Sequence, residues 1–171
     1  SNWKYNKEIA DKISEVAKAA NKAIGIKNGP SHTEIIITSE GPKIVELGAR
    51  LGGDNITTHL VPLSTGVNMV ECCIEIALGE KPDIEKKWNH GSAIRYFQQH
   101  AGIVGSIKGL EDAKKIEGIK QISIVHGVGE EVTEITSSGS RMGFVIAQDK
   151  NAASAIAKCE KAMAEIDINI R

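Results

Sequence analysis

The first third of the chain shows helical spacing of its apolar residues, followed by a pattern typical of strands. Apolar side chains recur at three- and four-residue steps over about residues 5–24, which predicts an amphipathic helix. Gly25 follows in the position of a helix C-cap. Two short apolar runs, 33–38 and 43–48, then flank the turn-forming letters SEGP. This region therefore predicts one helix and one β-hairpin.

The middle of the chain predicts an interrupted helical region and then a linker. Helical spacing runs over about residues 54–78, with interruptions near Pro62 and Gly66. The segment EKPDIEKKWNHGS that follows is polar and typical of a linker. We therefore predict two domains, residues 1–87 and residues 88–171.

Beyond the linker, short strand-like runs alternate with helical segments. The pattern predicts strands at 93–97, 103–107, 119–126, 131–137 and 143–148, and helices at 110–116 and 152–166. The spacing of the last helix directs Ile156, Cys159, Met163 and Ile166 inward. Several short strands flanked by helices in this order predict an antiparallel sheet of the α+β class.

Composition and charge narrow the classes of function. Hydrophobic residues make up 41% and charged residues 25% of the 171 positions, as in an ordinary globular protein. The net charge of −1 gives no electrostatic basis for binding nucleic acid or an anionic membrane. No apolar run approaches the roughly 20 residues that span a bilayer. Three cysteines without metal-ligand spacing favour a reducing, cytoplasmic location.

The predicted hairpin carries a glutamate in each strand, where an apolar residue would be usual. With the turn centred on Glu40, Glu34 lies opposite Glu46. In the same register, Ile36 lies opposite Ile44 and Ile35 opposite Val45. The two carboxylates then share one face of the hairpin. The opposite face, toward the core, would be formed by Ile35, Ile37, Val45 and Leu47. A register shifted by one residue would set each glutamate against a core residue, which the apolar pattern disfavours.

Two opposed carboxylates need compensation. At about 5 Å and an effective dielectric constant of about 20, they repel by around 3 kcal/mol. A shared proton, a nearby Arg or Lys, or a divalent cation would relieve this repulsion. Mg²⁺ suits Glu34 and Glu46, Arg50 can hold a phosphate or carboxylate, and the backbone at Gly52 and Gly53 can approach an anion. A solvated sheet face with surface charges of little consequence stays open as the alternative.

The order and spacing of Glu34, Glu46, Gly48 and Arg50 resemble the metal-binding signature of the ATP-grasp ligases. The letters GPSHTEIIITSEGPKIVELGARLGG around them, with SAIRYF, GIVGSIKGLEDA and GSRMGFVIAQDK further on, are similar to the branch that includes the L-amino acid ligases. The resemblance implies an α+β fold: the C-terminal portion of an ATP-grasp domain, an antiparallel sheet with helices. A small α/β subdomain like the C-terminal domain of biotin carboxylase would follow it.

The resemblance also implies a reaction. ATP would phosphorylate a carboxylate, and an amine would attack the acyl phosphate, with Mg²⁺ or Mn²⁺ as the metal. Glu34 and Glu46 would bind the metal, and Arg50 would be the catalytic residue that stabilises the transferring phosphoryl group. Gly52 and Gly53 would shape the pocket for the acyl end and the nucleotide.

Two departures from the family pattern qualify this picture. Gly48 stands where many members have an Asn ligand, so a second metal position would rest on two glutamates and water. No glycine-rich nucleotide loop with lysines precedes Glu34. We therefore expect a C-terminal fragment that is inactive alone and needs the N-terminal remainder of the same protein as its partner.

Alternatives stay open on the sequence. Carbamoyl-phosphate synthase or phosphoribosylglycinamide synthetase chemistry would use the same metal site on other acids. A non-catalytic module, in which residues 92–171 mediate homodimerisation, would leave the carboxylates idle. His32, at the open end of the hairpin, is expected to be structural rather than a substrate contact.

Overall fold

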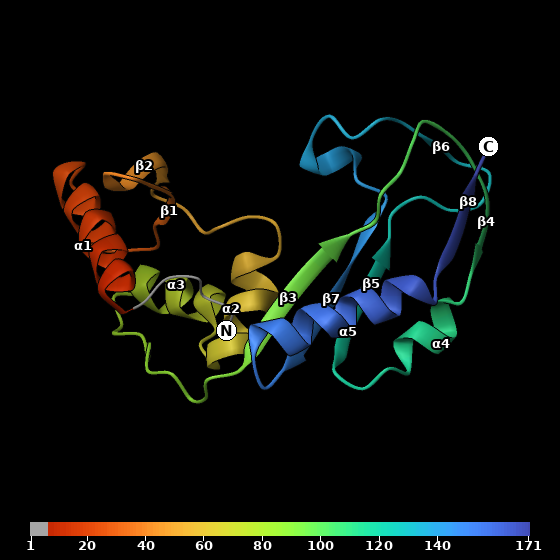
Figure 1. The fold of residues 1–171 in the computed structure, drawn as a ribbon. Helices are drawn as coiled ribbons and strands as arrows, with labels where there is room; N and C mark the ends of the chain where they lie inside the picture. The colour runs from red at the N-terminus through yellow and green to blue at the C-terminus, as the bar shows by residue number, and fades with distance from the viewer. Residues whose placement is uncertain (1–6) are drawn as a thin grey trace. The chain divides into compact units, whose positions relative to one another are not determined.

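The computed structural model describes residues 7–171, which divide into two compact units (Figure 1). The N-terminal unit comprises residues 7–62 and 66–87, and the C-terminal unit comprises residues 63–65 and 88–171. The assignment of two separate domains with a boundary after residue 87 stays a prediction.

In the N-terminal unit, one amphipathic helix packs on a two-stranded hairpin. Helix α1 (Lys7–Ala23) contacts β1 (His32–Thr38) and β2 (Gly41–Gly48). The helix buries one stripe partially and no residue fully, as its alternation of apolar and charged positions dictates. Gly25 adopts φ +81° and ends the helix as predicted. The predicted start of the helix at residue 5 lies outside the described residues.

The hairpin turn is tighter than predicted. Thr38 pairs with Gly41, so only Ser39 and Glu40 form the loop. The Thr38 hydroxyl accepts from the Glu40 N–H and donates to the Gly41 carbonyl, and Gly41 takes φ +106°, which favours glycine. The predicted four-residue turn SEGP is therefore wrong, because Gly41 and Pro42 already belong to β2.

A bulge then corrects the register. Near the turn, Ile35 pairs with Ile44 and Ile36 with Lys43, so the predicted pairs Ile36–Ile44 and Ile35–Val45 are wrong. A shift between Glu34 and Ile35 leaves Val45 as the extra residue of β2. Val45 is 63% exposed rather than on the core face. Beyond the bulge, Glu34 lies opposite Glu46, as predicted.

The helical region after the hairpin is interrupted where glycine requires it. It consists of η1 (Ile56–Leu60, a π-helix), α2 (Val61–Thr65) and α3 (Met69–Ala77). Gly66, at φ +79°, ends α2, and the Asn68 side chain caps α3 by accepting from the Glu71 N–H. Pro62 lies in the first turn of α2, where its missing N–H is not needed, so it does not interrupt the helix.

Within residues 7–171, no single helix is both long enough and apolar enough to cross a membrane. The two segments Ile56–Thr65 and Met69–Ala77 meet that criterion only as a pair, with a bend of 109° between them.

The C-terminal unit contains two antiparallel three-stranded sheets, with strand orders β3-β7-β5 and β6-β4-β8. This agrees with the predicted antiparallel α+β class. The elements are β3 (Gly91–Tyr96), β4 (Gly102–Lys108), α4 (Leu110–Lys114), β5 (Ile119–Ile124), β6 (Glu131–Val132), η2 (Ser138–Ser140), β7 (Gly143–Asp149), α5 (Ala152–Ala164) and β8 (Asp167–Ile170). The sequence pattern did not predict β8.

Strand β6 is much shorter than the predicted strand 131–137, because side chains satisfy the backbone beyond Val132. The Gln99 amide donates to the carbonyls of Thr133 and Ser140. The Ser140 hydroxyl accepts from the N–H groups of Thr136 and Ser137. Local side-chain bonds of this kind compete with a strand ladder, so the segment forms an irregular loop.

The core of the C-terminal unit lies where α5 crosses β3 and β7 (Figure 1). Cys159 is fully buried, and its thiol donates to the carbonyls of Ala93 and Val145 at 3.5 Å. The predicted inward positions Cys159 and Ile166 are buried, whereas Ile156 and Met163 are only partly so. The rest of the buried helix face is formed by Ala155 and Ala162, whose small side chains let the helix approach the sheet closely.

Candidate metal and phosphate site

The site is built on the open end of the hairpin, where Glu34 of β1 and Glu46 of β2 are direct cross-strand partners. Directly opposed residues of an antiparallel pair have Cβ atoms about 4.5–5.5 Å apart. Both carboxylates are about half exposed, so they are accessible to an ion from solvent. The opposed pair predicted from the sequence is therefore present.

Arg50 compensates one of the two charges. Its Nη2 donates to Glu46 Oε1 at 2.8 Å, and its Nη1 donates to the Leu51 carbonyl at 3.2 Å. The Arg50 side chain folds back over Gly48, where an added Cβ would lie 3.2 Å from Arg50 Cγ. A larger residue at position 48 would require Arg50 to move. Of the three remedies expected from the sequence, the nearby arginine is present at Glu46.

The second carboxylate has a histidine beside it. His32 Nε2 lies 3.4 Å from Glu34 Oε1, and the imidazole is largely buried, with 19% of the side chain exposed. An added Cβ at Gly52 would lie 2.9 Å from His32 Nδ1. Gly52 therefore leaves the space that the His32 ring needs beside Glu34. The predicted role of Gly52 in shaping a substrate pocket stays a prediction.

The loop that follows has an unusual backbone that the sequence did not reveal. Asp54 and Asn55, at φ +50° and +60°, are both left-handed and lead directly into the π-helix η1. The buried Thr57 hydroxyl donates to the Gly52 carbonyl at 2.9 Å and fixes this bend. Gly53 has no atom near its Cβ position. The only sequence signal for this left-handed backbone is the residue type, since Asp and Asn tolerate the left-handed region better than other non-glycine residues.

The donor set fits a cation that is shared with a ligand. Within residues 7–171, no group of three or more His, Cys, Asp or Glu side chains is placed to hold a metal together. A pair of carboxylates suits Mg²⁺, which usually takes one or two from the protein and completes its shell with water and substrate phosphates. Glu34 and Glu46 therefore suit Mg²⁺ that arrives with a phosphate, rather than a closed protein site.

Comparison with known proteins finds ligases among the relatives of this chain. Residues 95–171 match the family described as L-amino acid ligase C-terminal domain 2. The L-arginine-specific L-amino acid ligase of Bacillus subtilis is 26% identical over 136 residues, which are 78% of this chain and 32% of that protein. The phosphoribosylamine–glycine ligase of Methanococcus maripaludis is 25% identical over 166 residues, 92% of this chain and 37% of that protein.

Solved structures match almost the whole chain. The L-amino acid ligase from Bacillus licheniformis has a TM-score of 0.83 at 24% identity and covers 98% of this chain and 42% of its own. The phosphoribosylglycinamide synthetase from Anaerococcus prevotii has a TM-score of 0.85 at 21% identity, with coverages of 98% and 43%. The chain has the fold of the C-terminal part of an ATP-grasp ligase.

The fold is also similar to that of a biotin carboxylase domain. The biotin carboxylase domain of the Hydrogenobacter thermophilus 2-oxoglutarate carboxylase matches with a TM-score of 0.67 at 19% identity, over 97% of this chain and 37% of its own. The predicted likeness to biotin carboxylase is thereby confirmed at the level of fold. The chain spans about a third of the length of the curated relatives that it matches.

Proposed function

We propose that this chain supplies the metal-binding hairpin and the C-terminal unit of an ATP-dependent carboxylate–amine ligase. The observation that carries the proposal is the opposed pair Glu34–Glu46 with Arg50 on one of its members. The fold and the sequence similarity to ligases support a functional role for this pair over that of a solvated sheet face.

The proposal assigns a role to each side chain. Glu34 and Glu46 would hold Mg²⁺, or Mn²⁺ in its place, together with the nucleotide. When bound, the ion would neutralise charge on the phosphate oxygens. An exposed ion pair such as Arg50–Glu46 contributes only about 0–1 kcal/mol. Little energy therefore opposes the transfer of the guanidinium from Glu46 to phosphoryl oxygens, which it can bind bidentately.

The names of the relatives suggest the class of acid. One relative is an L-amino acid ligase and the other joins phosphoribosylamine to glycine, so in both names the acid is an amino acid. We propose that the acid activated here is also an amino acid, activated as an acyl phosphate. Glycine with phosphoribosylamine is the second candidate pair.

The three cysteines are free thiols, which supports a cytoplasmic location.

The decisive variant is Glu46→Gln in the longer protein that carries this chain. Loss of one charged ligand should lower the nucleotide-dependent release of phosphate by about 100-fold, the scale of losing one preorganised electrostatic contact. It should also raise the Mg²⁺ concentration needed for half-maximal rate. Unchanged activity and unchanged Mg²⁺ dependence would refute the assignment and favour the non-catalytic module.

A matched control is available in the same hairpin. Glu40 lies in the turn, is largely exposed, and forms an ion pair with Lys43 at 2.9 Å. Glu40→Gln removes the same charge from the same element and should leave the rate within about twofold, since surface substitutions have small effects. The chain of residues 1–171 alone should show no ATP hydrolysis. Turnover by this chain would contradict the need for an N-terminal remainder.

A further inference from the structure

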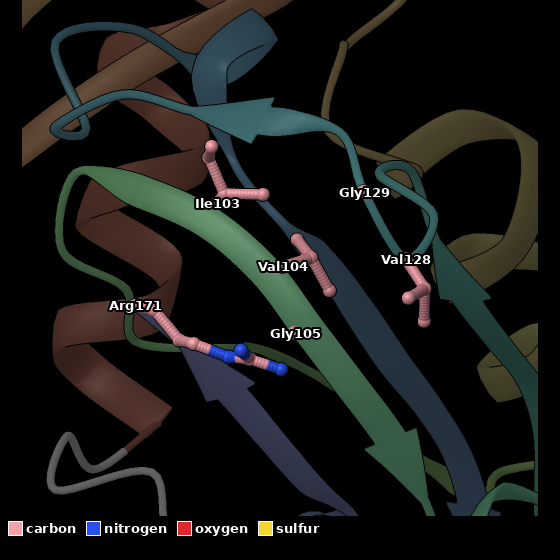
Figure 2. Close-up of a pocket in the computed structure, with 6 residues that line it drawn as sticks. All are labelled: Ile103, Val104, Gly105, Val128, Gly129 and Arg171. Carbon is pink, nitrogen blue, oxygen red and sulfur yellow. The ribbon is translucent and has the colours of Figure 1, made fainter.

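A cavity lies entirely within the C-terminal unit. It has a volume of about 350 Å³ and opens between β4 and the turn before β6 (Figure 2). This volume is at the lower end of the range for small-molecule sites, about 300–1,000 Å³. The cavity is lined by Ile103, Val104, Gly105, Val128, Gly129 and Arg171.

One wall of the cavity contains Gly105, a residue without a side chain. Gly105 lies at a bulge, where the pairing of β4 with β8 shifts between Val104 and Ser106. A Cβ added to Gly105 would lie 2.6 Å from Arg171 Nε and 3.2 Å from Arg171 Nη2. The glycine therefore leaves room for the Arg171 side chain, which points toward Gly105 of β4 in Figure 2. Bulges commonly re-aim side chains next to functional sites.

Backbone hydrogen bonds hold the main chain on both sides of the cavity. The Arg171 N–H donates to the Ile103 carbonyl at 3.0 Å, and the Ile103 N–H donates to the Arg171 carbonyl at 2.8 Å. On the other side, the Gly129 N–H donates to the Val104 carbonyl at 2.8 Å. These bonds hold the base of the arginine and the opposite turn on the two sides of the cavity.

The chemistry of the lining is one cation among aliphatic groups. Ile103 and Val128 are 54% and 64% exposed, although both are large apolar residues at the mouth of the cavity. Within residues 7–171, no hydrogen bond or ion pair engages the Arg171 guanidinium. A guanidinium can form two parallel hydrogen bonds with one carboxylate.

We propose that this cavity binds a small aliphatic carboxylate. The carboxylate would pair with Arg171, and the alkyl group would lie against Ile103, Val104 and Val128. A phosphate dianion fits less well, because the lining offers one cation and its other side chains are apolar. None of the lining residues belongs to the hairpin that carries the proposed ligase chemistry, and binding here does not depend on that chemistry.

The test is a titration of the ¹⁵N-labelled chain of residues 1–171, followed by the amide resonances of Gly105, Val128 and Gly129. The probes are isovalerate, its neutral analogue isovaleramide, and inorganic phosphate, each up to about 50 mM, the range that detects millimolar affinity. Isovalerate should shift these resonances saturably. The amide and phosphate should bind at least about tenfold more weakly, since each loses a match of charge or shape.

Three variants make the test specific. Arg171→Gln should weaken isovalerate binding at least about tenfold, and Gly105→Ala should weaken it by displacing the guanidinium. Lys108→Gln removes one positive charge from the same strand outside the cavity and should leave binding unchanged. Absence of saturable shifts, equal binding of isovaleramide, equal or tighter binding of phosphate, or full binding by Arg171→Gln would each overturn the proposal. None of these readouts uses ligase activity, so failure here and failure of the proposed function are distinguishable.

Discussion

The hairpin exposes large apolar side chains, whereas the C-terminal unit buries them. In the C-terminal unit, Met142, Val145 and Ile146 are completely buried, and α5 covers one side of their sheet. In the hairpin, Ile36 and Val45 are 55% and 63% exposed, and the helix that contacts the strands buries no residue fully. The part of the chain that carries the proposed chemistry is therefore the part with the least burial, whereas the buried core stabilises a different part.

This difference is expected on physical grounds. Carboxylates that bind a metal with a ligand must stay accessible, and burying them unpaired would cost several kcal/mol each. A core, in contrast, gains about 25 cal/mol for each Å² of apolar surface that it removes from water.

The largest effect on stability should come from the core of the C-terminal unit. Ile146→Ala should lower the free energy of unfolding by about 2–5 kcal/mol, because it removes buried methylenes and leaves a cavity. Ile36→Ala in the hairpin is the matched control and should change it by no more than about 0.5 kcal/mol. Urea denaturation of both variants measures this. Equal losses would show that the hairpin is as tightly packed as the core.

Substitution of Arg50 should affect activity strongly and stability weakly. In the longer protein, Arg50→Gln should reduce nucleotide-dependent activity by about 10²–10³-fold, the cost of losing one charge-stabilising donor. Its stability should change by less than about 1 kcal/mol, because the Arg50–Glu46 pair is half exposed. Steady-state kinetics and urea denaturation of the same sample separate the two effects. A large loss of stability with unchanged kcat would make Arg50 a structural residue.

Amide hydrogen exchange should be slower in the core strand β7 than in the hairpin strands. Amides of β7 should exchange at least about 100-fold more slowly than those of β1 and β2, because local opening is easiest where few apolar contacts are buried. Exchange of the chain followed by NMR or mass spectrometry gives these rates. Equal protection of hairpin and core strands would remove the proposed difference in local stability.

Sequence reasoning succeeded where a pattern was local and failed where distant contacts decided. Glu34 and Glu46 were paired correctly, yet the pairs between them and the turn were wrong. A two-residue turn and the bulge at Val45 shift the register in opposite directions, and their effects cancel at the glutamates. The bulge has no local signature in KIVEL.

The same limit explains the errors in the C-terminal unit. The run 131–137 has strand-like composition, but Gln99, more than thirty residues earlier, takes the Thr133 carbonyl and so competes with strand pairing. Strand β8 consists of the four residues Asp167–Ile170, too short for a clear alternation, and only its pairing with β4 defines it. The recognition of the ATP-grasp portion succeeded because the spacing of Glu34, Glu46 and Arg50 is itself a local motif.

The smallest predicted effect concerns the buried thiol of Cys159. Burial, opposed in part by the charge of Arg95, raises the pKa of Cys159 to about 11 from an ordinary value of 9.0. The folded state therefore holds the thiol proton more tightly than the unfolded state. The resulting stabilisation is fully present below pH 9 and is lost as the pH rises from 9 toward 11, because only the unfolded chain releases the proton there.

The pH dependence and the reactivity of the thiol test this together. Between pH 8 and pH 10.5, the urea midpoint of the unmodified chain should fall more than that of Cys159→Ala, which lacks the titrating group. In the folded chain at pH 8, a thiol reagent should modify the half-buried Cys73 well before Cys159, since the thiolate is the nucleophile and a raised pKa removes it. Equal falls in the two midpoints, or early modification of Cys159, would mean that the core around α5 admits water as readily as the hairpin does.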